Sequence, residues 1–208
     1  MLKSMVRGIF FDFYSVWTPD TIQDLLKQAS ARVPKDAVIL AEIVEQYYHG
    51  LIDISRLANA FSTELGRPDV TAESLTLHDS DISPAVADLM RGLHSHFLKL
   101  GVLGNLGRME LDLLNRFNTS QALFEVIMSP LAIGSNAPLL SEEVFGEALR
   151  AIGEPPESCL VISGHDDYLD CAASLEMQTV KFAGQANLRK ALTEILSQEI
   201  PSFVGPNK

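Results

Sequence analysis

The sequence predicts an α/β protein in which a Rossmann-like parallel-sheet core carries an inserted helical cap. Short apolar runs alternate with amphipathic helical patterns through the last two-thirds of the chain, a rhythm typical of doubly wound parallel sheets with right-handed crossovers. An isolated apolar run near the N-terminus ends in Asp12. Only helical patterns follow it up to residue 82, and that stretch is far longer than a simple crossover between parallel strands.

The expected strands are short, apolar and bounded by turn residues. After the run that ends at Asp12, they cover residues 99–104, 125–128, 158–162 and 178–182. Runs of this length and composition are typical of strands buried on both faces of a sheet. Helices are expected at 84–96, 109–117, 141–152, through Ala172 and Leu175, and at 187–198.

The expected cap consists of three amphipathic helices at residues 21–31, 37–48 and 55–65, the last ending at Gly66. Glycine is the usual residue just beyond a helix C-terminus. We therefore expect a core domain made of residues 1–16 and 83–208, and a helical cap domain made of residues 17–82.

The charge of the chain argues against two classes of partner. The sequence has 16 basic and 27 acidic residues, a formal net charge of −11, without the basic face that nucleic acid or an anionic membrane requires. No signal peptide or spanning apolar run is evident, and the two cysteines do not form a CxxC motif. We expect a cytoplasmic protein with a small-molecule substrate or ligand, no nucleic acid and no membrane. The sequence does not define a protein partner.

Polar residues lie where the expected strands end. Asp12, Asn105 and Ser163 each follow an apolar run, and His165 comes two residues after Ser163. Ligands of open parallel sheets bind in the crevice beyond the carboxyl ends of the strands. An aspartate there can act as a nucleophile or a metal ligand, although Asp12 could also simply cap a turn.

This order of elements resembles the haloacid dehalogenase-like hydrolase superfamily over essentially the whole chain. The segment FFDFYSVW resembles its first motif, with Asp12 at the position of the covalent nucleophile. VLGNLG resembles the second motif, Ala137-Pro138 the third, and LVISGHDD the fourth. The insert YYHGLIDISRLANAFSTELG resembles the cap of a subgroup containing sugar-phosphate phosphatases and the N-terminal domain of soluble epoxide hydrolases.

The motifs are eroded relative to this family. The resemblance implies an acid/base Asp two residues after the nucleophile, a phosphoryl-binding Ser or Thr, a cationic Lys and a metal-binding acid. This chain has, in that order, Tyr14, Gly104, Ala137 and Ser163. Mg²⁺ is therefore a doubtful cofactor, for which Asp12 and Asp167 would be the ligands.

Loss of the cationic Lys and of the metal-binding acid matters because phosphatase chemistry brings a carboxylate against a phosphate dianion. At about 4 Å and an effective dielectric of about 20, that repulsion is roughly 8 kcal/mol. Arg108 is the nearest replacement cation in the sequence, and Trp17 is expected to fill the crevice beside Tyr14. The predicted catalytic residues are Asp12, Tyr14, Asn105, Ser163 and His165, and the predicted substrate-binding residues are Gly104, Arg108 and Trp17.

Three functions are compatible with the pattern. The first is a haloacid dehalogenase-like hydrolase by descent with a degenerate site, weak or absent phosphatase activity and a binding or regulatory role. The second is an active hydrolase of a small phosphorylated or halogenated substrate through Asp12. Tyr14 and Ser163 also resemble the metal-free 2-haloacid dehalogenase branch, whereas Ala137 argues against it. The third is a protein-interaction module that uses the cap surface.

Overall fold

The computed structural model describes residues 5–18, 20–134 and 141–196. Its core is a five-stranded, entirely parallel sheet with the strand order β3-β2-β1-β4-β5. The strands are β1 (Gly8–Asp12), β2 (Lys99–Leu103), β3 (Phe124–Met128), β4 (Cys159–Ser163) and β5 (Gln178–Lys181). The expected Rossmann-like sheet is confirmed, and the expected strand positions agree with it to within one or two residues.

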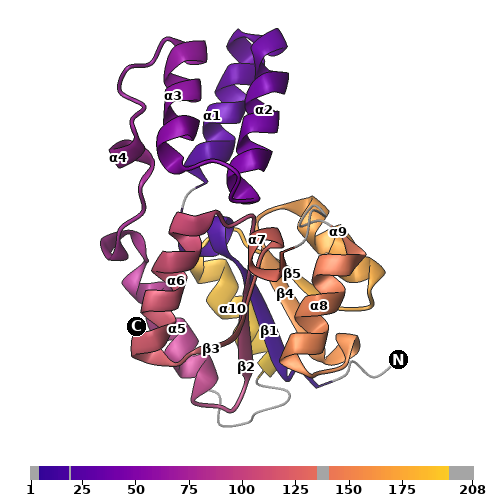
Figure 1. The fold of residues 1–208 in the computed structure, drawn as a ribbon. Helices are drawn as coiled ribbons and strands as arrows, with labels where there is room; N and C mark the ends of the chain where they lie inside the picture. The colour runs from indigo at the N-terminus through magenta and orange to yellow at the C-terminus, as the bar shows by residue number, and fades with distance from the viewer. Residues whose placement is uncertain (1–4, 19, 135–140, 197–208) are drawn as a thin grey trace.

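Helices cover both faces of the sheet because the strands are apolar on both faces. Ile9 and Phe11 of β1 pack on one face and Phe10 packs on the other, all three fully buried. The first face is covered by α5 (Pro84–His94), α6 (Arg108–Gln121) and α10 (Gln185–Leu196), and the second by α8 (Glu142–Ile152) and α9 (Asp166–Ser174). Figure 1 shows this three-layer arrangement.

The strand order changes direction beside β1. The chain runs from β1 outward to β2 and β3, then returns to add β4 and β5 on the other side of β1. Phe11 is in register with Ile162, so the last residues of β1 and β4, Asp12 and Ser163, come together at the carboxyl edge of the sheet. Such a switch point is where open α/β sheets form their ligand crevice.

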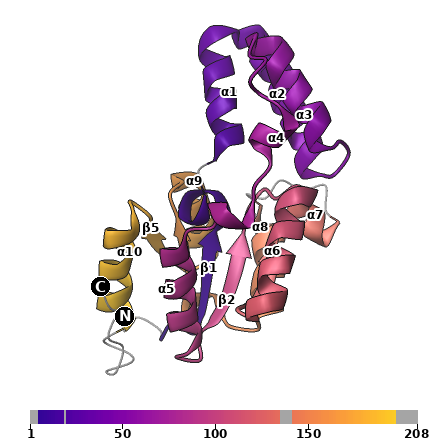
Figure 2. The ribbon, with the colours of Figure 1, turned by 90° about the vertical axis from the view of Figure 1, so that its left-hand side faces the viewer.

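The cap stands over this carboxyl edge, as Figures 1 and 2 show. Asp20 begins its first helix as an N-cap, and Gly66 ends the third in the left-handed region at φ 61°, a conformation that glycine adopts readily. The cap helices are α1 (Thr21–Arg32), α2 (Pro34–Tyr48), α3 (Ile54–Leu65) and the single turn α4 (Ala72–Leu75). A short 3₁₀ turn, η2 (Asp79–Asp81), precedes the return to α5.

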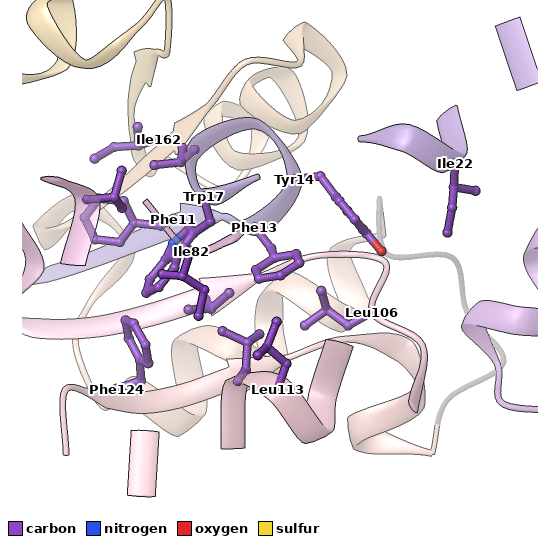
Figure 3. Close-up of a cluster of buried hydrophobic side chains, with 14 of the residues drawn as sticks. Phe11, Phe13, Tyr14, Trp17, Ile22, Ile82, Leu106, Leu113, Phe124 and Ile162 are labelled. Atoms are coloured by element: carbon purple, nitrogen blue, oxygen red, sulfur yellow. The ribbon is translucent and has the colours of Figure 1, made fainter. Parts of the chain in front are cut away.

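A π-helical turn, η1 (Phe13–Trp17), directly follows Asp12 and was not expected from the sequence. Turns of this kind are rare and occur frequently at functional sites. Figure 3 shows that Tyr14 and Trp17, three residues apart in this turn, point their side chains in different directions. Phe13, Tyr14 and Trp17 are all buried, which anchors the segment that presents Asp12.

The helices in the described ranges are short. The longest, α2, has 15 residues, and none is both long and apolar enough to cross a membrane.

Candidate active site

Asp12 is held at the carboxyl edge of the sheet by two serine hydroxyls. Its side chain is buried, with 1% of the residue surface exposed. Ser15 Oγ and Ser163 Oγ each donate a hydrogen bond of 2.6 Å to the same oxygen, Asp12 Oδ2. Asp12 and Ser163, which both lie where predicted strands end, are therefore in direct contact.

Backbone amides complete this arrangement. The Gly164 N–H donates to Ser15 Oγ at 2.8 Å, and the His165 N–H donates to Ser163 Oγ at 2.9 Å. Each serine hydroxyl therefore accepts a hydrogen bond from a backbone amide just after β4 and donates one to Asp12. Both hydroxyl protons are committed to the carboxylate, which fixes its orientation. We call Ser15 and Ser163 the serine clamp.

Burial and hydrogen bonding oppose each other in setting the charge of Asp12. Burial raises the pKa of the Asp12 carboxyl, while the two clamp hydroxyls and the nearby His165 lower it. Burial has the larger effect, so the pKa lies above the ordinary aspartate value. The clamp therefore stabilises an anion that the surrounding protein would otherwise disfavour.

A cavity of about 210 Å³ adjoins Asp12. It brings together four of the residues that the sequence singled out, namely Asp12, Tyr14, Asn105 and His165, with the predicted metal ligand Asp167. The sequence analysis missed the remaining lining residues, which are Asp20, Gln23, Lys27, Tyr48 and Tyr168. Most of these belong to the cap helices, whose position over the sheet has no local sequence signal.

Tyr14 stands at the acid/base position of the resembled family but is engaged elsewhere. Its hydroxyl donates a 2.7 Å hydrogen bond to Glu110 Oε1, and Tyr47 of the cap donates one of 2.6 Å to Glu110 Oε2. Glu110 is buried in the first turn of α6, and burial raises the pKa of its carboxyl. We call these three residues the cap latch, because they join the η1 turn, the core helix α6 and the cap helix α2.

The structure places the predicted substrate-binding residues outside the Asp12 cavity. Gly104 is buried, and a β-carbon there would lie 2.8 Å from a methyl carbon of Leu106, so the expected Ser or Thr would displace that side chain. Arg108 lines a separate cavity of about 660 Å³ between α6 and the cap. The expectation that Arg108 supplies the missing cation beside Asp12 is therefore not met.

Trp17 also differs from the expectation. Its ring packs edge-on against Phe117 and Phe124, with ring centroids 5.4 and 5.3 Å away. Figure 3 shows it within the cluster of buried hydrophobic side chains, pointing away from Tyr14. Sequence proximity to Asp12 suggested a crevice residue, but the π-helical turn directs the side chain into the core.

The residues beside Asp12 do not suit a resident Mg²⁺ ion. Among the described residues, no group of three or more His, Cys, Asp or Glu side chains is arranged to hold a metal. The clamped oxygen of Asp12 already accepts two hydroxyl protons, and Asp166 pairs with Lys181 at 2.7 Å. Asp167 lines the cavity, where it accepts a 3.0 Å hydrogen bond from the Tyr168 N–H. Ala137, at the position of the family's Lys, lies outside the described residues.

Comparison with protein-family models and with curated proteins finds no match. Solved structures are similar across nearly the whole chain. A predicted haloacid dehalogenase-like family hydrolase from Porphyromonas gingivalis is 20% identical with a TM-score of 0.64, covering 93% of this chain and 98% of that one. A haloacid dehalogenase family enzyme from Bacteroides thetaiotaomicron, in complex with magnesium and inorganic phosphate, is 17% identical with a TM-score of 0.60. The match covers 86% of this chain and 96% of that one.

An L-2-haloacid dehalogenase from Xanthobacter autotrophicus, with chloropropionic acid covalently bound, is also similar. It is 16% identical with a TM-score of 0.53, and the match covers 98% of this chain and 85% of that one. Structural similarity at these low sequence identities establishes the fold of this chain. The chain has the fold of haloacid dehalogenase-like hydrolases, with a Rossmann-like core and a helical cap.

Proposed function

We propose that this protein is a haloacid dehalogenase-like hydrolase by descent whose site is degenerate for Mg²⁺-dependent phosphatase chemistry, and which retains a small-molecule binding role. The serine clamp carries this proposal. Ser163 stands where the resembled family has a metal-binding acid, and its hydroxyl occupies Asp12 Oδ2 at 2.6 Å. We further propose that the protein is cytoplasmic and, because its net charge is −11, that it has no nucleic-acid partner.

The charge of the cavity supports the loss of phosphatase activity. Asp12, Asp20 and Asp167 line it, together with Lys27. Lys27 is already paired with Asp24 at 3.1 Å. A phosphate dianion about 4 Å from a single carboxylate meets roughly 8 kcal/mol of repulsion at an effective dielectric of about 20, which corresponds to about six decades of rate.

A phosphomonoester screen with and without Mg²⁺ tests this proposal. We expect wild-type turnover at the level of an Asp12→Asn control. Calorimetric titration should show Mg²⁺ affinity no tighter than millimolar, because hard divalent ions need several oxygen ligands. Robust turnover that vanishes in Asp12→Asn, or micromolar Mg²⁺ affinity that depends on Asp12, would contradict the proposal.

A second candidate function is metal-free hydrolysis at carbon, with Asp12 as the nucleophile. The observation that favours it is that Asp12 Oδ1 accepts no side-chain hydrogen bond from the described residues, while Oδ2 is fixed by the clamp. Attack on a neutral carbon electrophile requires no approach to a dianion. The acidic lining favours uncharged substrates over 2-haloacid anions.

Halide release tests the second candidate. We expect the wild type to release chloride from 2-chloropropionamide faster than from 2-chloropropionate, and Asp12→Asn to release none above background. Equal release by wild type and Asp12→Asn would exclude Asp12 as the nucleophile.

A further inference from the structure

We propose that Asp20 is the general acid/base of the Asp12 site. In the resembled family an Asp has this role at the position that Tyr14 occupies here, and Tyr14 cannot perform it. This inference rests on the second candidate function, hydrolysis at carbon through Asp12. It adds a catalytic residue that belongs to none of the resembled motifs.

The position of Asp20 suits this role. It lies between the η1 turn and the cap helix α1, and its carboxylate lines the same cavity as Asp12 and His165. One oxygen is anchored, because Oδ1 accepts a 2.9 Å hydrogen bond from the Gln23 N–H as the N-cap of α1. The anchored carboxylate keeps a fixed orientation in the cavity lining, where it can accept a hydrogen bond from a water molecule.

Tyr14 is excluded from acid/base work by its own contacts. Its hydroxyl proton is donated to Glu110 at 2.7 Å, in the buried cap latch. Burial and the Glu110 charge together raise the pKa of Tyr14 well above its ordinary value, so the phenol neither gives nor takes a proton near neutral pH. The acid/base function therefore needs another residue.

The electrostatic surroundings of Asp20 support its assignment. Burial raises the pKa of the Asp20 carboxyl to about 6, the charges of Asp12 and Asp24 raise it further, and the Gln23 amide and His165 oppose the increase. Lys27 and Asp167 are the other charged groups that line the cavity. A carboxylate with a pKa near 6 is mostly ionised at pH 7 and remains basic enough to take a proton from water.

The reaction proceeds in two balanced steps. In the first, an Asp12 oxygen forms a bond to carbon while the carbon–halide bond breaks and halide leaves, giving an ester on Asp12. In the second, the Asp20 carboxylate takes a proton from water as the hydroxide adds to the ester carbonyl carbon. The protonated Asp20 then gives that proton to the departing alkoxide, which releases an alcohol and leaves Asp12 as a carboxylic acid. Asp12 loses this remaining proton to solvent, which restores both carboxylates and accounts for the one proton that the overall hydrolysis produces.

His165 is the rival base, since it lines the same cavity. Its ring lies against Tyr168 at a centroid distance of 5.8 Å, and no side-chain hydrogen bond to its ring nitrogens is made by the described residues. Asp20, by contrast, is anchored at one oxygen. His165→Asn is therefore included as the competing variant.

The test follows the Asp12 ester formed from 2-chloropropionamide, by chloride assay and by intact-protein and peptide mass spectrometry. Asp24→Asn is the matched control, because it removes the same charge from the same helix at an exposed position outside the cavity. We expect multiple turnovers without adduct in the wild type and Asp24→Asn. Asp20→Asn should release one chloride per protein and accumulate the Asp12 ester, with hydrolysis about 100-fold slower or more.

The pH profile supplies a readout that a purely structural role would not change. Ester hydrolysis in the wild type should rise with pH through about 6, as Asp20 loses its proton, and then level off. Asp20→Asn should lack that inflection while keeping a wild-type melting temperature.

The other outcomes overturn the proposal in distinguishable ways. Wild-type turnover in Asp20→Asn, or ester accumulation in His165→Asn alone, overturns the Asp20 role and leaves Asp12 as the nucleophile. An Asp12 ester that persists in the wild type does the same. Absence of both chloride and adduct in the wild type overturns the second candidate function and the Asp20 assignment with it.

Discussion

Replacing Tyr47 with phenylalanine is expected to destabilise the protein by breaking the cap latch. The Tyr47 hydroxyl donates a 2.6 Å hydrogen bond to the buried carboxylate of Glu110, and Tyr14 donates to its other oxygen. The ring of Tyr47 also lies directly over Gly107, where a β-carbon would come within 2.5 Å of Tyr47 Cζ. Phenylalanine keeps that packing and removes only the hydrogen bond.

The magnitude follows from the charge of the acceptor. A hydrogen bond to a charged group contributes about 1.5–3 kcal/mol, and a buried acceptor that loses one partner retains its desolvation cost. For a chain of this size each kcal/mol corresponds to about 2–4 °C in melting temperature, so a decrease of about 3–12 °C is expected.

Tyr48→Phe provides the matched control for chemical and thermal unfolding. Tyr48 is the next residue on α2 and equally buried, but its hydroxyl makes no hydrogen bond of acceptable geometry with any described residue. Its removal should change the free energy of unfolding by less than about 0.5 kcal/mol. If Tyr47→Phe cost no more than Tyr48→Phe, the latch would contribute nothing to stability and this reasoning would be refuted.

The latch also predicts a pH dependence. Burial raises the pKa of Glu110 in the folded state above the ordinary glutamate value, so the folded state binds its proton more tightly than the unfolded state. The Glu110 contribution to stability is then fully present below the unfolded pKa and is lost as the pH rises through the folded pKa. The stability advantage of wild type over Glu110→Gln should therefore shrink with rising pH in urea unfolding.

Three further predictions concern neighbouring residues. Gly107→Ala should destabilise the protein more than Gly146→Ala, because a β-carbon at Gly107 collides with Tyr47 while one at Gly146 meets nothing within 4 Å; thermal unfolding of both variants checks this. Ser163→Ala should raise the pKa of Asp12 further, since it removes a 2.6 Å hydrogen bond to the carboxylate. Carbon-detected NMR titration measures this pKa, and an unchanged value would show that the clamp does not stabilise the Asp12 anion. Trp17→Ala should cost about 3–5 kcal/mol in denaturant unfolding, because it removes a buried ring that packs against Phe124, and a cost below about 1 kcal/mol would contradict its place in the core.

The sequence was sufficient to predict the core because the relevant signals are local. Short apolar runs with intervening amphipathic segments define the sheet, and the helix expected at residues 141–152 is α8, which Ser141 and Gly153 cap. The meeting of Asp12 and Ser163 also follows from such signals, since parallel strands end at the same edge. The sequence predicted that both residues lie at this edge, whereas the pairing of β1 with β4 and the hydrogen bond between the two side chains come from the structure.

The rest of the site depends on contacts that no local pattern contains. Tyr14 and Glu110 are 96 positions apart in the sequence, and Tyr47 reaches Glu110 from the cap helix α2. Asp20 did carry a local signal, because an aspartate before Thr21 is typical of an N-cap. That signal predicts the helix start correctly but cannot reveal that the same carboxylate also faces the Asp12 cavity.

The latch changes how the Tyr14 substitution is understood. An eroded catalytic position would be expected to hold a residue with no particular partner, and its reversal to Asp would then be structurally neutral. Here the Tyr14 hydroxyl satisfies one oxygen of a buried carboxylate, so Asp at this position would leave Glu110 Oε1 without its donor and add a second acid close to it. The residue at the family's acid/base position thus shares with Tyr47 of the cap helix α2 the two oxygens of one buried carboxylate in the core. An Asp at position 14 alone would therefore leave a buried carboxylate with one donor fewer beside a second acid, so the structural cost of restoring the family's residue falls on Glu110.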